Sequence, residues 1–128
     1  MAIYVVRLGT PRAPDEGLRI GTVRRPPRGV PKAEFAVRDF YDVWLPNIAP
    51  SEELLKAGHA VEDERGWRAF ERRYRAEMGR PENGRILDVL AALSHQANFS
   101  VGCYCENELR CHRSVLRQLL LDRGAKLA

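Results

Sequence analysis

Cysteine is scarce in this sequence, and its three cysteines all fall between residues 103 and 111. An odd number confined to one segment cannot form the dispersed disulfide framework of a small secreted protein, so we expect reduced thiols and a cytoplasmic location. No apolar run approaches the ~20 residues that span a bilayer, and the first residues lack a basic, cleavable signal pattern. We therefore expect no membrane partner.

Neither hydrophobicity nor charge is extreme. Hydrophobic residues make up 45% of the chain and charged residues 30%, a balance that excludes a disordered, highly charged polypeptide. A chain of 128 residues suffices for one hydrophobic core, so we predict one domain over residues 1–128. The formal net charge of +4 permits a polyanionic partner without requiring one.

The hydrophobic pattern alternates between strand and helix periods along the chain. It predicts strands over residues 3–8, 18–23, 36–45 and 99–103, with a short helix as the alternative for the third. It predicts helices just after Ser51 and over residues 63–78, 82–97 and 111–123, the third with Ile86, Leu90 and Leu93 on one face and Leu87 and Ala91 beside it. This order predicts the α/β class, with helices covering a mixed or parallel sheet.

The segment 103–113, Cys-Tyr-Cys-Glu-Asn-Glu-Leu-Arg-Cys-His-Arg, concentrates the reactive side chains of the chain. A strand that turns through a polar loop into a helix leaves free N–H groups and a positive dipole end at the loop. Arg110 and Arg113 add donors suited to an oxyanion. We therefore predict that this loop binds a small anionic substrate or ligand.

A thiol at such a helix start is also a candidate nucleophile. The dipole and the arginines stabilise the thiolate, so Cys105 or Cys111 is the predicted nucleophile, with packing as the alternative role for each. We expect Cys103 to be a core residue, because it ends an apolar strand. His112 is either a partly exposed first-turn histidine or the acid–base group and ligand-orienting residue.

The loop spacing limits the enzyme classes that the segment resembles. Cys105 and Arg110 bound a six-residue loop of rhodanese-like length, whereas the phosphatase spacing would require a cysteine at position 104, which is Tyr104. Glu106 and Glu108 oppose both thiolate formation and anion capture, because their charge is negative.

Metal binding is a competing use of the same side chains. Cys103, Cys105, Cys111 and His112 total four ligands, but their spacing differs from the usual paired zinc knuckles. Adjacent residues at a helix start also point about 100° apart. We therefore predict no metal site and no cofactor.

Basic residues suggest a second class of function. Arg24, Arg25 and Arg28 form a cluster among prolines, which predicts phosphate contacts in a non-catalytic nucleic-acid-binding or protein-binding module. The arginines of the predicted helix 63–78 alternate with glutamates, so we interpret that helix surface as a solvated face with i,i+4 ion pairs.

The order of several short motifs resembles one protein family. They are Asp15-Glu-Gly-Leu-Arg-Ile20, Pro27-Arg-Gly29, Asp42-Val-Trp-Leu-Pro46, Ala49-Pro-Ser51, Trp67, Phe70-Glu-Arg-Arg-Tyr74 and the closing Cys-His-Arg. Together they resemble the DUF488 family, including its YeaO-like branch, with the Cys-His-Arg ending of other members. The resemblance covers nearly the whole chain and implies the family's fold, and it assigns no reaction.

Overall fold

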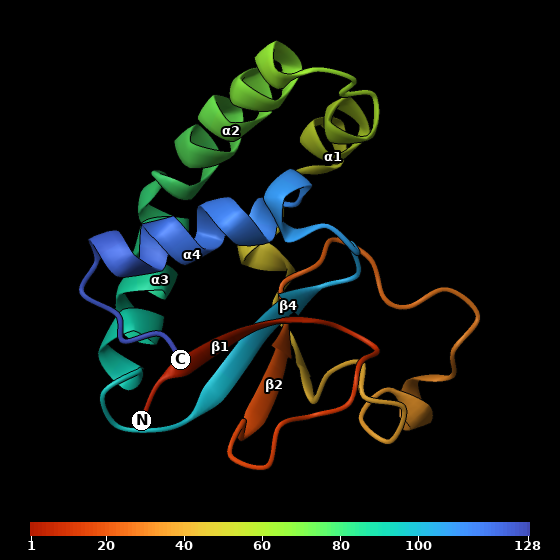
Figure 1. The fold of residues 1–128 in the computed structure, drawn as a ribbon, viewed down its shortest axis with the longest axis vertical. Coiled ribbons are helices and arrows are strands. Elements are labelled where there is room, and N and C mark those ends of the chain that lie inside the picture. Colours follow the sequence, from red (N-terminus) through yellow and green to blue (C-terminus); the bar gives the residue numbers. More distant parts are fainter.

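The computed structural model describes residues 1–128 and places four strands in one parallel sheet, in the order β1-β4-β2-β3. The strands are β1 (Ile3–Arg7), β2 (Leu18–Gly21), β3 (Val43–Trp44) and β4 (Phe99–Cys103). The central strand is β4, whose Val101 pairs with Val5 of β1 and with Ile20 of β2 (Figure 1). The predicted α/β class is confirmed, and the sheet is purely parallel.

The sheet is covered by helices on one face and by loops on the other. Phe99 and Val101 of β4 belong to the main hydrophobic core, which includes residues from all four helices. Ser100 points the opposite way, and its hydroxyl donates a hydrogen bond of 2.7 Å to Glu16 in the loop before β2. All five residues of β4 are buried as a result, which suits a central strand in a parallel sheet.

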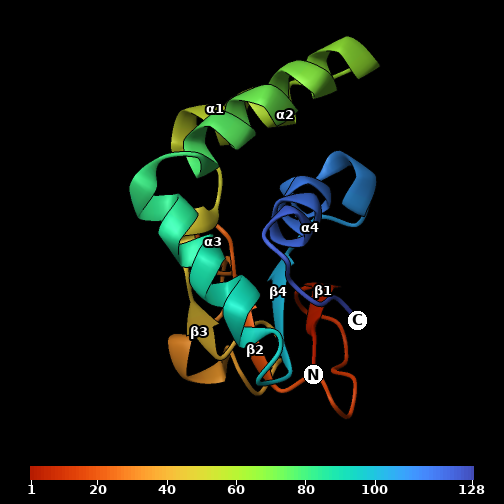
Figure 2. The same cartoon turned by 90° about the vertical axis from the view of Figure 1, so that its left-hand side faces the viewer.

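The helices are α1 (Glu52–His59), α2 (Glu64–Met78), α3 (Pro81–Leu93) and α4 (His112–Asp122). Ser51 caps α1 by accepting a hydrogen bond from the N–H of Leu54, and Asp63 caps α2 through the N–H of Gly66. Figure 2 shows α3 and α4 together beside the sheet, with α2 extending beyond them. No helix combines the length and the apolar character needed to cross a membrane.

The inner face of α2 matches the predicted pattern. Trp67, Phe70, Tyr74 and Met78 are all buried in the main core. The Tyr74 hydroxyl donates a hydrogen bond of 2.7 Å to the carbonyl of Ile48, so this buried polar group is satisfied.

The structure corrects the end of α3 and the position of Leu93. The helix stops at Leu93, four residues earlier than predicted, and Leu93 is 44% exposed. Leu87, Leu90 and Ala91 are buried, and Ile86 is partly buried against the core, so Leu93 alone leaves the predicted apolar surface. The helix ends here because of the buried Ser94, whose hydroxyl donates to the carbonyl of Ala91 and accepts from the N–H of Lys126. These bonds compete with continuation of the helix.

The strand predicted over residues 36–45 is wrong except at Val43–Trp44. The chain makes a 3-10 turn at Lys32–Glu34 and then further turns, with Asp39 at a positive φ of 61°. The guanidinium of Arg12 donates to the carbonyl of Ala36 and to the carboxylate of Asp42, and so holds this segment from a distant loop. The alternating hydrophobic pattern of residues 36–45 cannot reveal a restraint imposed by a residue so distant in the sequence.

A buried ion pair supports the loop-covered face of the sheet. Arg19 on β2 is 0% exposed and Glu16 is 2% exposed, and two hydrogen bonds of 2.7 and 2.9 Å join their side chains. The remaining donor group of Arg19 contacts the carbonyls of Thr10 and Asp39 at 2.8 and 2.7 Å. Both charges are therefore fully hydrogen-bonded, which a buried pair requires.

Candidate functional site

The connection from β4 to α4 brings the three cysteines together at the carboxyl end of the central strand. Cys103 is the last residue of β4, and Cys111 is the residue before α4. The loop between them contains a 3-10 turn at Glu108–Arg110. Ligands of open α/β sheets bind at this end of the strands, so the location suits a functional site.

The sulfur atoms and one imidazole lie within contact distance of one another. Cys103 Sγ is 3.8 Å from Cys105 Sγ, and Cys111 Sγ is 3.8 Å from His112 Nδ1. The donor atoms of Cys103, Cys111 and His112 all lie within 4.8 Å of one another. Cys103 and Cys111 are buried and Cys105 is exposed, and all three are free thiols.

The backbone at Cys111 explains how two adjacent residues reach one point. Cys111 has φ −127° and ψ 149°, an extended conformation, whereas α4 begins at His112. The expected divergence of about 100° holds only where both residues are helical. Cys103, Cys111 and His112 therefore form a set of donors that could hold a soft metal ion such as Zn²⁺.

His112 is buried at 5% exposure, which corrects the prediction of a partly exposed first-turn histidine. Its Nε2 lies 2.8 Å from the carbonyl oxygen of Thr22. A carbonyl can only accept, so Nε2 carries a hydrogen, and in the neutral ring Nδ1 is left with its lone pair. That lone pair faces Cys111 Sγ, while the ring packs edge-on against Tyr74 at 5.5 Å between centroids.

The three thiols have very different affinities for a proton. Hydrogen bonds from Cys103 and Cys105, and a further one with His112, lower the pKa of Cys111 well below that of an ordinary thiol. Cys103 interacts with Cys105, which lowers its pKa, but its hydrogen bond to Cys111 and its burial raise that pKa to about 12. The pKa of Cys105 is raised by its hydrogen bonds to Cys103 and Cys111. Of the three thiols, Cys111 is therefore the one that gives up its proton most readily.

The two predicted anion-binding arginines do not converge. Arg113 is buried at 3% exposure, and its guanidinium donates to the carbonyl of Cys105 while its Nε has no partner. Arg110 pairs with Glu64 of α2 at 2.8 Å and lies over the ring of Trp67. Of these two arginines, only Arg113 therefore bonds to the backbone of a cysteine in the segment.

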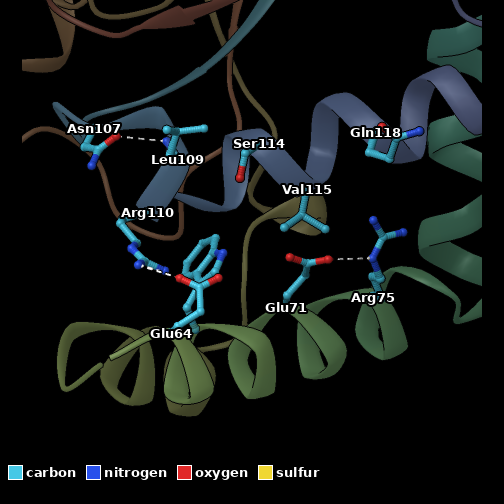
Figure 3. Close-up of a pocket in the computed structure, with 10 residues that line it drawn as sticks. Glu64, Glu71, Arg75, Asn107, Leu109, Arg110, Ser114, Val115 and Gln118 are labelled. Carbon is cyan, nitrogen blue, oxygen red and sulfur yellow. Dashed lines mark hydrogen bonds and ion pairs between the residues drawn. The ribbon is translucent and has the colours of Figure 1, made fainter. Parts of the chain in front are cut away.

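Arg110 instead borders a separate cavity of about 630 Å³ between α2 and the start of α4. Figure 3 shows Arg110 reaching down to Glu64, with Glu71 and Arg75 paired farther along α2. None of the three cysteines lines this cavity. The cavity and the thiol cluster are thus two distinct features.

The two glutamates of the loop form ion pairs with arginines rather than contacts with the thiols. Glu108 accepts two hydrogen bonds, of 2.9 and 3.0 Å, from Arg117 of α4. Glu106 is largely exposed and lies 3.6 Å from Arg7. Neither glutamate pairs with Arg110 or Arg113, so neither occupies the place of an anionic ligand at these two arginines.

The predicted basic cluster is mostly engaged within the fold. Arg24 donates to the carbonyls of Pro50 and Ala49, and Arg25 pairs with Glu52. Arg28 makes no ion pair and borders a small cavity with Tyr104 and other residues. Nucleic-acid contact by these arginines stays a prediction, with Arg28 the exposed candidate that makes no ion pair.

Sequence reasoning missed two parts of the site. The carbonyl of Thr22 is separated from His112 by 90 positions along the chain, and a backbone group has no sequence signature. Cys103 is buried as expected of a core residue, but it also touches the thiol of Cys105. The Cys-x-Cys spacing was the available signal for the second feature.

The fold and the site together define a small parallel α/β protein with a cysteine and histidine cluster at the carboxyl edge of its sheet. The chain belongs to the DUF488 family, because residues 3–124 match a family model, DUF488-N3a, described as the active DUF488-N3 subclade. Comparison with curated proteins and with solved structures gives no match. The expected family membership is confirmed, and assignment to the YeaO-like branch stays a prediction.

Proposed function

We propose that this protein is a thiol-based enzyme in which Cys111 is the nucleophile and His112 is its general base. The observation that carries this proposal is the position of His112 Nδ1, 3.8 Å from Cys111 Sγ, with Nε2–H directed to the carbonyl of Thr22. A base oriented by a third group beside a nucleophile is the arrangement that activates thiols in enzymes. The description of the matched subclade as active fits a retained reaction centre.

The surroundings favour the charges that this chemistry creates. When the Cys111 proton moves to Nδ1, the imidazolium keeps its hydrogen bond to Thr22 and the thiolate stays at the N-terminus of α4. Arg113 adds positive charge to this part of the fold, because its buried guanidinium bonds to the carbonyl of Cys105 and its Nε has no partner. The imidazolium then holds a proton that it can return to a leaving group.

The same features limit the substrate to a small anionic electrophile. Cys111 is 2% exposed, so a bulky substrate cannot reach its sulfur without movement of the loop. Arg113 and the helix start provide positive potential, which favours an anion. Cys105, the exposed member of the cluster, marks the side from which a ligand approaches.

Site-resolved alkylation of metal-free protein with a small thiol reagent at pH 7 tests the proposal. We expect Cys111 to react faster than an ordinary thiol of pKa about 8.5, and His112→Ala to slow that reaction at least about tenfold. His95→Ala is the matched control, because His95 Nε2 also lies 2.8 Å from a backbone carbonyl, that of Gly124, away from any cysteine. Uniformly slow alkylation, or equal rates in both variants, would refute the thiol mechanism.

A further inference from the structure

We infer that Cys103, Cys105, Cys111 and His112 bind one soft divalent cation, with Zn²⁺ as the best-suited ion. The inference extends to regulation, since a bound ion would occupy the Cys111 sulfur and withhold it from chemistry. That second part rests on the proposed function, whereas the metal site itself does not.

The spacing of the donor atoms fits a tetrahedral zinc site. With Zn–S bonds of about 2.3 Å and Zn–N bonds of about 2.0 Å, a tetrahedron has S···S edges of about 3.8 Å and S···N edges of about 3.5 Å. The S···S distance between Cys103 and Cys105 and the S···N distance between Cys111 and His112 are both 3.8 Å. The donor atoms of Cys103, Cys111 and His112 all lie within 4.8 Å of one another, and Cys105 joins them through its contact with Cys103.

The imidazole is already fixed in the form that binds metal. A metal-ligating histidine donates its other ring N–H to a carbonyl or carboxylate, which fixes the tautomer and the ring orientation. The carbonyl of Thr22 receives Nε2–H in this way and leaves Nδ1 free toward the sulfurs. The Thr22 hydroxyl donates to the carbonyl of Gly102 at 2.9 Å and so ties this support to β4 itself.

The charge of the surroundings suits thiolate ligands. Three thiolates, one neutral imidazole and Zn²⁺ carry a net charge of about −1. The buried Arg113 forms no salt bridge to a carboxylate, and its side chain reaches the carbonyl of Cys105. Its positive charge therefore compensates the net negative charge of a zinc–thiolate centre.

The difference in burial among the ligands suggests how the ion enters and leaves. Cys103, Cys111 and His112 are buried, whereas Cys105 is exposed at the edge of the cluster. Cys105 is thus the ligand that can exchange with solvent thiols or chelators, and its release would open the fourth position.

Titration of metal-free protein with Co²⁺, followed by displacement with Zn²⁺, tests the site. We expect one Co²⁺ per chain, with thiolate-to-cobalt charge-transfer absorption and the strong visible bands of tetrahedral coordination. Cys103→Ser, Cys111→Ser and His112→Ala should each weaken binding more than the roughly 10–100-fold that loss of an outer-shell partner costs. His95→Ala should leave binding unchanged, and Cys105→Ser should weaken it least.

A second measurement keeps the test decisive where a variant fails to fold. One equivalent of Zn²⁺ added to the wild-type protein should protect the three cysteines from alkylation, and a chelator should restore their reactivity. Absence of thiolate-to-cobalt absorption, or full alkylation in the presence of Zn²⁺, would overturn the metal site. Reactive Cys111 without metal binding would leave the proposed function standing, whereas metal binding with an unreactive metal-free Cys111 would remove the proposed function alone.

Discussion

The buried pair of Glu16 and Arg19 gives a sharp prediction about stability. Glu16→Gln removes the negative charge and sets an amide NH₂ group against the guanidinium, which keeps its own charge in a site with 0% exposure. Breaking a buried pair in this way costs about 3–5 kcal/mol, because the remaining charge is uncompensated. A domain of this size has about 5–15 kcal/mol of unfolding free energy, so the variant should lose a large part of it.

Urea denaturation of Glu16→Gln and of Asp15→Asn measures this difference. Asp15 is the exposed neighbour, and its replacement should change the unfolding free energy by less than about 0.5 kcal/mol. Combining Glu16→Gln with Arg19→Met should recover much of the loss, since an apolar replacement leaves no buried charge. A loss below about 1 kcal/mol for Glu16→Gln alone would refute the view that the pair is dry and tightly coupled.

Three further predictions concern pH, backbone and surface. Burial alone would raise the pKa of Glu16, but hydrogen bonds from Arg19 and Ser100 lower it below 4.5. The stabilisation by the ionised carboxylate is therefore present above pH 4.5 and lost as the pH falls through the lowered pKa. Urea midpoints measured between pH 7 and 3 should fall less steeply in Glu16→Gln than in the wild type. Gly17→Ala should destabilise the protein more than Gly29→Ala. Both glycines have φ 74°, but only at Gly17 would an added Cβ clash, 2.1 Å from the carbonyl oxygen of Asn98. Equal thermal midpoints of the two variants would contradict this. Arg24→Met should cost about 1–3 kcal/mol in denaturant unfolding and Arg28→Met almost nothing, since only Arg24 holds backbone carbonyls.

The sequence predicts most of the fold because local patterns determine most of it. The spacing of Trp67, Phe70 and Tyr74 marks the inner face of α2, and Ser51 marks the start of α1. Residues 36–42 are different, because Arg12 holds them through contacts across 24 to 30 positions of the chain. The end of α3 likewise depends on Lys126, which donates to the hydroxyl of Ser94.

The candidate site was predictable in its location and not in its internal geometry. The cluster of Cys105, Cys111 and His112 identifies the loop by composition alone. Arg110 and Arg113 lie three residues apart, which favours a common ligand, but Arg110 forms an ion pair with Glu64 of α2 and points to that helix. The backbone conformation of Cys111, helical or extended, determines whether its sulfur and the His112 ring point to the same place. That conformation depends on how the 3-10 turn at Glu108–Arg110 connects to α4.

Support of His112 by a backbone carbonyl has a consequence for mutational studies. Thr22 contributes its carbonyl oxygen to the ring, so replacing its side chain leaves that atom on the chain. Alanine scanning would report Thr22 only through the hydroxyl that bonds to Gly102. The orientation of the imidazole is therefore encoded in the path of the chain after β2, and the side chain at position 22 acts on it only indirectly.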